Sequence, residues 1–302
     1  MITTRKIKII KKRMKVIKNT ICNTIRIIKS REQQVIAFWW TGMDNNWGDA
    51  LNPILIQNMT GKKPILSTEV FNVKKNNVYS VIGSVLEVPS KKDLVVWGSG
   101  FMSSESQFKV KPKKIHAVRG PKTRELILKN GIYCPEVYGD PAILYPYFYR
   151  PTIQKKYKLG IIPHYVDQDS QLLDVFKNDS SVLIIDILSG VKEVVDKICS
   201  CEKIASSSLH GIIAADSYGI PAIWIEFSKK VNGDGFKFYD YFESVGRKNE
   251  VPLTLTQNTT ICDIIDHYKE YKIEIDVEKL VDSCPFIDNK RKEGIKKEIK
   301  KS

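Results

Sequence analysis

From residue 35 onward, short apolar runs alternate with polar loops that contain glycine or proline. Apolar runs of this length, bounded by turn residues, predict buried strands. The strands expected in the first half of the chain are 35–40, 78–83, 93–100 and 114–118. Those expected in the second half are 158–165, 182–188, 203–206 and 220–227.

Helix signals fall between these strands. Pro53 predicts the first position of a helix that is capped by Asn52 and ended by Gly61. Pro121 predicts the start of a second helix, which stops at Gly131. Further helices are expected near 170–178, near 190–200, from about Leu209, at 259–271 and at 276–283.

Prolines and aromatic residues gather at 146–151 and mark a boundary near residue 150. The pattern therefore predicts two α/β domains, each a Rossmann-like, doubly wound parallel sheet, facing each other across a cleft. We expect the first at 32–150 and the second, with its closing helices, at 151–289. Ligands of such sheets bind at the carboxyl ends of the strands.

Residues 1–31 differ from this body because they are basic and amphipathic. They hold eleven Lys or Arg and no acid, and the cations interrupt the apolar run of about 20 residues that a membrane-crossing helix needs. We expect a helix lying on an anionic membrane surface, or else a helix docked on the protein's own body. Steps of three and four residues place one apolar stripe on it, formed by Ile7, Ile10, Met14, Ile17, Ile21, Ile25 and Ile28.

The net charge of +14 belongs to the two ends of the chain. Residues 290–302 carry seven basic and two acidic side chains, and they form a basic tail that is solvated or adds to membrane adhesion. Residues 32–289 carry 30 basic and 32 acidic side chains, so the body is nearly neutral. A neutral body without a basic stripe interleaved with aromatic residues argues against nucleic acid as a partner.

The six cysteines are too sparse for a disulfide framework, and the chain shows no cleavable signal peptide. We therefore expect reduced thiols in a cytoplasmic protein, held peripherally at the inner face of the cell membrane by residues 1–31.

Four segments lie where an expected strand gives way to a helix or loop, and we expect them to converge. Helix N-termini at such places offer backbone amides and partial positive charge, which suit a phosphate or a carboxylate. The segments are NNWGDALN (45–52), VRGPKT (118–123), GDPA (139–142) and SSSLHG (206–211).

The ordered set NWGDALN, WGSGF, VRGPKTRELILKNG, GDPAIL and SSSLHGIIAADSYGIPAIWIE resembles the polysaccharide pyruvyltransferase family, in particular its capsule and exopolysaccharide branch. The resemblance covers residues from about 36 to about 250. It implies a fold like that of GT-B glycosyltransferases, phosphoenolpyruvate as donor, and two hydroxyls of a free or lipid-linked sugar as acceptor. The product would be a pyruvate ketal, formed without a separate cofactor and without a metal.

This chemistry requires an acid that protonates the methylene carbon of the donor and a base for the hydroxyls. His210 is the expected acid, since it lies at a strand end and its ordinary pKa is near 6.5; a buried structural histidine is the alternative. Asp140 and Asp49 are the candidate bases, or else they hold a turn and cap a helix. Asn46 and Gly48 are expected to line the pocket, where the glycine also serves the loop geometry.

Arg119 is the expected ligand for the donor's anionic groups, because a guanidinium at a strand end fits a phosphate or carboxylate. An ion pair with Glu125 at the surface is the alternative. Many family members carry an arginine two residues before the motif histidine, where this chain has Ser208. The groups expected to compensate are the donors of the serine run, including Ser207, and the cations Lys229, Lys230 and Lys237.

Two other functions fit the same architecture. A GT-B-type glycosyltransferase would use a nucleotide sugar in place of phosphoenolpyruvate. A non-catalytic sugar-binding or scaffold protein of the cell envelope would show no turnover and would tolerate the loss of His210.

Overall fold

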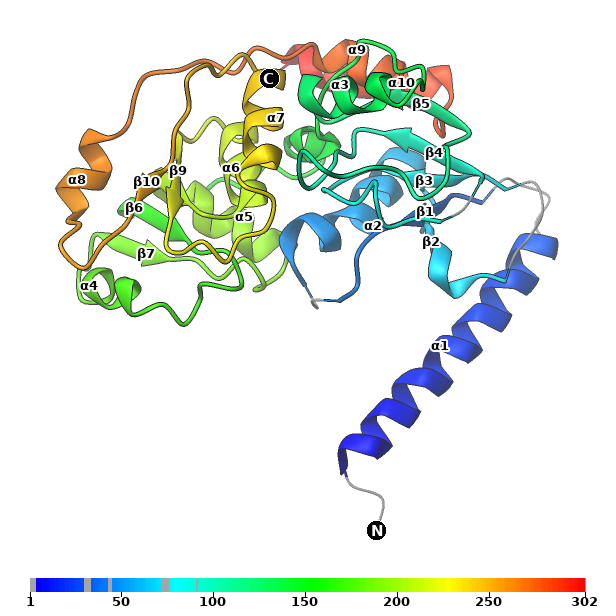
Figure 1. The fold of residues 1–302 in the computed structure, drawn as a ribbon, viewed down its shortest axis with the longest axis horizontal. Coiled ribbons are helices and arrows are strands. Elements are labelled where there is room, and N and C mark those ends of the chain that lie inside the picture. The colour runs from blue at the N-terminus through cyan, green and yellow to red at the C-terminus, as the bar shows by residue number, and fades with distance from the viewer. Residues whose placement is uncertain (1–3, 30–33, 43–44, 72–75, 91, 302) are drawn as a thin grey trace.

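The computed structural model describes residues 4–29, 34–42, 45–71, 76–90 and 92–301. Its body contains two parallel five-stranded sheets side by side (Figure 1). The first sheet has the order β2-β1-β3-β4-β5. Its strands are β1 (Ile36–Phe38), β2 (Ile65–Leu66), β3 (Val78–Ser80), β4 (Leu94–Trp97) and β5 (Lys114–Ala117).

The second sheet has the order β10-β9-β8-β6-β7. Its strands are β6 (Tyr157–Ile162), β7 (Val182–Ile184), β8 (Cys201–Ser206), β9 (Ala222–Glu226) and β10 (Leu253–Thr254). Both sheets are buried between helices, which explains why their strands are runs of apolar residues. The expectation of an α/β protein with two Rossmann-like domains is confirmed.

The helices that follow the strands cover the faces of the sheets. Those of the body are α2 (Trp47–Thr60), α3 (Pro121–Lys129), α4 (Asp174–Lys177), α5 (Val191–Cys199), α6 (Leu209–Ser217), α7 (Phe236–Ser244), α8 (Ile261–Asp266), α9 (Val277–Asp282) and α10 (Asn289–Lys301). Three 3-10 helices complete them: η1 (Ser67–Glu69), η2 (Pro141–Tyr147) and η3 (Gln171–Leu173).

Helix α2 begins six residues before the position predicted for it. Asn46 is its N-cap, and Pro53 lies inside the helix. Trp47 explains the early start, because its side chain is fully buried and its indole donates a hydrogen bond to the carbonyl of Val191 at 3.1 Å. This contact ties the first turn of α2 to the second domain, and such tertiary packing outweighs the local cost of a proline.

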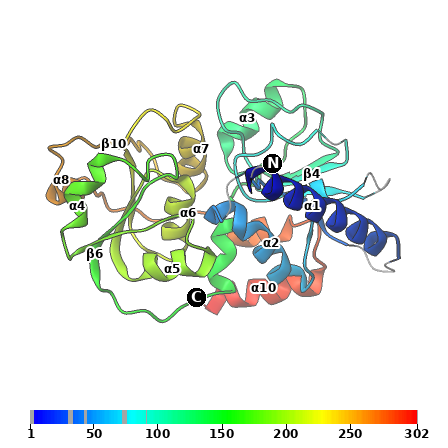
Figure 2. The same ribbon diagram turned by 90° about the horizontal axis from the view of Figure 1, so that it is seen from below.

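The last helices return to the first domain. The expected helix 259–271 ends at Asp266, and the chain then crosses back beside the first sheet, where α9 and α10 lie (Figures 1 and 2). The indole of Trp97 donates to the carbonyl of Leu280 at 3.0 Å, and Arg291 donates to the carbonyl of Met59 at 3.2 Å. The structure thus groups α9 with the first domain rather than the second, and residues 289–301 form a packed helix instead of a solvated tail, with Ile295 buried.

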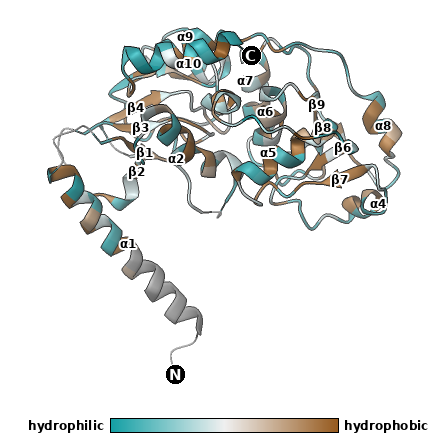
Figure 3. Cartoon of the chain, turned by 180° about the vertical axis from the view of Figure 1, so that it is seen from behind, coloured by the Kyte–Doolittle hydropathy of each residue, from teal (hydrophilic) through white to brown (hydrophobic). Residues whose placement is uncertain are grey.

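Helix α1 (Thr4–Lys29) extends away from the body on the side of the first domain (Figures 1 and 2). It touches the body near its C-terminal end, where Asn19 donates to Glu69 in η1 and Ile27 packs on the first domain's core. In the coloured, C-terminal part of α1, brown and teal positions lie side by side (Figure 3). Ile7 and Ile10 fall outside the described side chains; the other residues of the expected stripe are exposed, namely Met14, Ile17, Ile21, Ile25 and Ile28.

Of the helices in the described ranges, none has both the length and the apolar composition needed to cross a membrane.

Candidate active site

A cavity of about 370 Å³ lies between the two domains. Its lining residues follow the carboxyl ends of strands from both sheets: Trp40 follows β1, Gly83 follows β3, His164 follows β6, and Ser208 follows β8. The remaining residues of the lining are Asn46, Asp49, Ser84, Val85, Glu87, Val88, Met102, Tyr165, Leu209, His210, Asn232 and Lys237. This is the place where doubly wound sheets bind their ligands.

His210 is the second residue of α6 and lies against α2 of the other domain. A Cβ atom placed on Gly48 would come within 2.2 Å of the imidazole, so only a glycine allows this approach. Nε2 of His210 is buried and has no hydrogen-bond partner among the described residues. One nitrogen of the imidazole beside the cavity is therefore left without a hydrogen bond by the described residues.

Burial, together with the cations Lys237 and Arg119, lowers the pKa of His210 to about 3. The expectation that His210 keeps an ordinary pKa is therefore wrong, because the cavity removes the imidazole from water and places it near positive charge. His210 is neutral there at pH 7. An anionic ligand would offset these cations and raise its pKa.

Lys237 projects into the cavity from the first turn of α7 and is 7% exposed. Burial, followed by the charge of Arg119, lowers its pKa to about 8. No carboxylate pairs with its ammonium group among the residues that the structure describes. His164, also in the lining, has its pKa lowered to about 3 by burial and by Lys237. At pH 7 the positive charge of the lining therefore belongs to Lys237, beside two neutral imidazoles.

The serine run shapes the N-terminus of α6. Ser208 is the N-cap and lines the cavity, and its side chain makes no capping hydrogen bond. Ser207 is buried behind it, where its Oγ accepts a hydrogen bond from the backbone N–H of His164 at 2.7 Å. Of the two serines predicted to bind substrate, Ser208 lies in the cavity and Ser207 supports it.

Asp49 and Asn46 enter the cavity from the start of α2. Nδ2 of Asn46 donates to Oδ2 of Asp49 at 2.9 Å. Burial raises the pKa of Asp49 to about 6, against the opposing effect of the hydrogen bond from Asn46. A carboxylate with a pKa this close to neutrality is suited to accept a proton from a hydroxyl.

Arg119 lies outside the lining and is fully buried. Its Nε donates to Asp240 at 2.9 Å, one terminal nitrogen donates to Oγ of Ser84 at 2.5 Å, and the other donates to the carbonyl of Phe101 at 2.6 Å. The surface ion pair with Glu125 is not formed, because Glu125 pairs with Lys129. Arg119 therefore acts on the cavity through its charge and through Ser84, which does line the cavity.

Three further predicted residues lie away from the cavity. Asp140 is fully buried and its Oδ1 accepts a hydrogen bond from the backbone N–H of Ala142, so it caps η2. Burial raises the pKa of Asp140 to about 6. Lys229 and Lys230 are exposed on the loop before α7, and Lys229 pairs with Glu226 at 2.7 Å. Of the predicted cations, Lys237 alone lines the cavity.

Sequence reasoning did not select several residues of the lining. His164 and Tyr165 come just after β6, beyond Pro163, and Ser84 follows Gly83 after β3, so their signal was a polar residue close to a strand end. Trp40 and Asn232 had no comparable local signal. Within the described ranges, no group of three or more His, Cys, Asp or Glu side chains is arranged to hold a metal ion.

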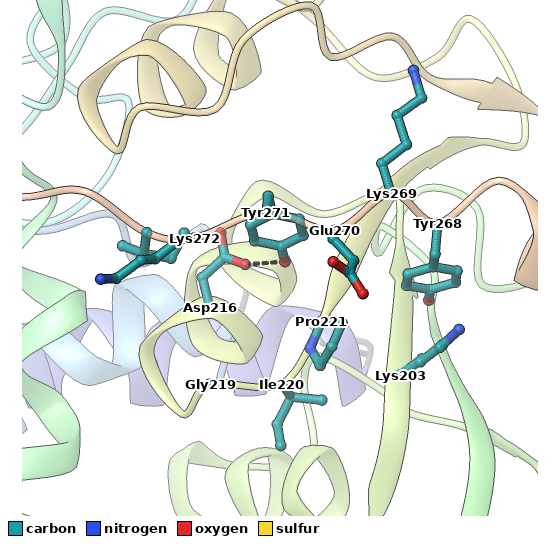
Figure 4. A pocket seen from close by; sticks show the side chains of 11 residues that line it. Lys203, Asp216, Gly219, Ile220, Pro221, Tyr268, Lys269, Glu270, Tyr271 and Lys272 are labelled. Carbon is teal, nitrogen blue, oxygen red and sulfur yellow. Dashed lines mark hydrogen bonds between the residues drawn. The ribbon is translucent and has the colours of Figure 1, made fainter.

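A second cavity, of about 690 Å³, lies at the opposite end of the second sheet, beside the start of β9 (Figure 4). Asp216 at its edge is fully engaged, since it accepts hydrogen bonds from Tyr271 at 2.6 Å, from Tyr241 at 2.9 Å and from Arg247. This network joins α6 and α7 to the segment between α8 and α9, which contains Tyr271. Although this cavity is larger, its buried charges are paired within the protein, so we place the active site at the carboxyl ends of the strands.

Two Rossmann-like domains whose strand ends share one cavity define this protein as a two-domain α/β protein with an inter-domain site. The family model described as polysaccharide pyruvyl transferase matches residues 81–228, which extend from the end of β3 to the loop after β9. The uncharacterized protein L143 of Acanthamoeba polyphaga mimivirus is 34% identical over 213 residues, covering 67% of this chain and 72% of that protein. The succinoglycan biosynthesis protein ExoV of Rhizobium meliloti (strain 1021) is 28% identical over 229 residues, covering 72% of this chain and 68% of that protein. The chain belongs to the polysaccharide pyruvyltransferase family and is a transferase.

Proposed function

We propose that this protein transfers pyruvate from phosphoenolpyruvate to two hydroxyls of one sugar in a surface polysaccharide or its lipid-linked precursor. The observation that carries the proposal is the cavity itself, where a buried lysine without a carboxylate partner faces a neutral histidine with a free nitrogen. Such a site favours a small ligand with several negative charges. Phosphoenolpyruvate, with its phosphate and carboxylate, is a ligand of this kind.

The donor's anionic groups would bind Lys237 and the N-terminus of α6 at Ser208. Arg119, which is buried outside the lining, would add positive charge, in keeping with its effect on the pKa of His210 and of Lys237. Lys229 and Lys230 are exposed on the adjacent loop, so we assign them at most a role in attracting the donor.

In the reaction, His210 would donate a proton to the methylene carbon of the donor, which leaves an oxocarbenium-like centre at the adjacent carbon. One sugar hydroxyl attacks this centre and Asp49 accepts its proton. The carbon–oxygen bond to phosphate then breaks, and the proton held by Asp49 passes to the departing phosphate. The second hydroxyl closes the ketal ring and gives its proton to His210, which restores the acid. Asn46 would orient Asp49, and Gly48 would hold His210 at its working distance. For Asp140, the geometry supports a role in holding the turn of η2.

We further propose that the inter-domain cavity corresponds to the cleft of a GT-B-like fold, and that α1 holds the enzyme at the inner face of the membrane. The exposed apolar residues of α1, and the eleven cations of residues 1–31, support adhesion to anionic lipid. This placement would bring the cavity near lipid-linked acceptors.

Incubation of the purified protein with phosphoenolpyruvate and extracted lipid-linked oligosaccharide tests the function. We expect release of phosphate and a product whose mass has increased by one pyruvate ketal, and neither with the His210→Asn variant. Turnover of a nucleotide sugar without consumption of phosphoenolpyruvate would instead identify a glycosyltransferase. Absence of any turnover, with no effect of the variant on sugar binding, would favour a binding protein.

A further inference from the structure

Asp240, in the middle of α7, connects the two domains through contacts that are entirely buried. Its Oδ2 accepts hydrogen bonds from Nε of Arg119 at 2.9 Å and from Oγ1 of Thr123 at 2.7 Å. Its Oδ1 accepts a hydrogen bond from the backbone N–H of Thr123 at 2.8 Å. Arg119 and Thr123 belong to the first domain, whereas α7 belongs to the second, and all three side chains are 0% exposed.

The backbone of α7 approaches the first domain equally closely. A Cβ atom placed on Gly120 would lie 1.8 Å from the carbonyl oxygen of Asp240, so a side chain at this position would push the helix away. The loop before α7 makes a similar approach, because a Cβ on Gly233 would lie 2.2 Å from the carbonyl oxygen of Met102. The start of α7 is therefore fixed to the first domain by both side-chain and backbone contacts.

Lys237 precedes Asp240 by three residues on this helix. Residues at this spacing lie on the same face of a helix, so the turn that Asp240 holds is the turn that carries Lys237. The ammonium group of Lys237 shares the cavity with His164 and His210 of its own domain and with Glu87 of the first domain. Among the described residues, no carboxylate forms an ion pair with Lys237.

We infer that Asp240 is a positioning residue, whose hydrogen bonds to Arg119 and Thr123 hold α7 so that Lys237 stays in the cavity. The use of Lys237 to bind the donor's phosphate or carboxylate rests on the proposed function. Asp240 itself lies outside the cavity lining and need not touch the substrate. The sugar acceptor plays no part in this inference.

Three variants separate positioning from general stability. Asp240→Asn replaces the carboxylate that accepts a hydrogen bond from Nε of Arg119 with an uncharged amide. Thr123→Val removes the hydroxyl that donates to the same carboxylate and changes no charge. Glu243→Gln is the matched control, because Glu243 lies on the same helix and pairs with Lys122 across the same interface at 2.9 Å, but in an exposed position. Calorimetry would give the affinity for phosphoenolpyruvate. NMR of carbon-13-labelled lysine, assigned with Lys237→Arg, would give the pKa of Lys237 in the free protein.

We expect Asp240→Asn and Thr123→Val each to weaken phosphoenolpyruvate binding about tenfold or more, since a shift of about 1 Å at a binding group has effects up to ~10²-fold. Thr123→Val should also raise the pKa of Lys237 from about 8 toward its ordinary value, because the released ammonium group reaches water. His164, His210, Glu87 and Asp49 line the cavity with this group, Arg119 acts on it from outside the lining, and Thr123→Val changes none of these residues. Glu243→Gln should change neither quantity.

A folded Thr123→Val protein with the wild-type affinity and the wild-type pKa of Lys237 would overturn the inference. If Asp240→Asn does not fold, Thr123→Val decides the question alone. If the wild-type protein does not bind phosphoenolpyruvate, the proposed function fails. The pKa of Lys237 in the free protein still decides whether the contact at Asp240 positions it.

Discussion

Replacing Gly48 with alanine would test whether the position of His210 sets the rate of the reaction. A Cβ atom at residue 48 would lie 2.2 Å from Cε1 and Nδ1 of the imidazole and 2.4 Å from Nε2. Carbon atoms pack at about 3.5–4.0 Å, so the ring or the start of α2 must move by more than about 1 Å. Because misplacement of a reacting group by about 1 Å can cost ~10²-fold, we expect turnover to fall about a hundredfold.

The expected change in stability is much smaller. Overpacking a buried contact costs about 1–3 kcal/mol, whereas alanine is favoured over glycine inside a helix by about 1 kcal/mol. The two effects oppose each other in α2, so the free energy of unfolding should fall by at most about 2 kcal/mol. Steady-state phosphate release and thermal unfolding, measured on the same preparation, would give both quantities.

Gly294→Ala provides the matched control. Gly294 also lies within a helix, α10, but a Cβ atom there would meet nothing within 4 Å. We expect this variant to gain about 0.5–1 kcal/mol of stability and to keep full turnover. Near-normal turnover of a folded Gly48→Ala protein would refute the reasoning, because it would mean that the imidazole need not occupy its observed place.

The remaining predictions concern the acid, the charge of the cavity and the membrane. His210→Asn should lower turnover by about 10²–10⁴ with little change in donor affinity, as steady-state kinetics and calorimetry would show; near-normal turnover would eliminate the acid role. Binding of phosphoenolpyruvate at pH 7 should take up protons, since its negative charge raises the pKa of His210. Affinity should fall above about pH 8, because Lys237 then loses its proton. Calorimetry in two buffers of different ionisation enthalpy measures the number of protons taken up. A value of zero would contradict the expected rise in the pKa of His210. Deletion of residues 1–31 should release the protein from anionic vesicles, because each cation near the surface contributes about 1 kcal/mol to binding. Equal sedimentation of the full and the shortened chain with vesicles would contradict the role of α1 as a membrane anchor.

Much of the fold was predictable because burial on both faces makes the strands of a parallel sheet continuously apolar. The run 93–100 contains β4, and α6 begins at Leu209 as expected. Helix α2 was misplaced because its first turn depends on Trp47, whose hydrogen bond to Val191 joins residues 144 positions apart. The placement of α9 beside Trp97 likewise depends on a contact between distant parts of the chain.

The site was predictable where its residues belong to segments that follow strand ends. Asn46, Asp49, Ser208 and His210 line the cavity as expected, and so does Lys237 from the first turn of α7. Gly83 and Ser84 also line it, although no motif singled them out. The surroundings of these residues were not predictable, since burial and charge come from distant segments. Asp240 is 121 residues from Arg119, and nothing in FKFYDYF distinguishes it from a surface acid.

For the mechanism, the most important property that the sequence could not predict is the pKa of His210. A histidine with a pKa of about 3 is unprotonated at pH 7 and is then a poor proton source. The shift arises from burial and from Lys237 and Arg119, and an anionic donor bound to Lys237 would offset the contribution of these cations. Under the proposed function, His210 therefore gains its proton as the donor binds, which ties the presence of the acid to the presence of the carbon that it must protonate. The neutral imidazole, and an ammonium group that no carboxylate among the described residues pairs with, favour binding of the anion before the proton transfer.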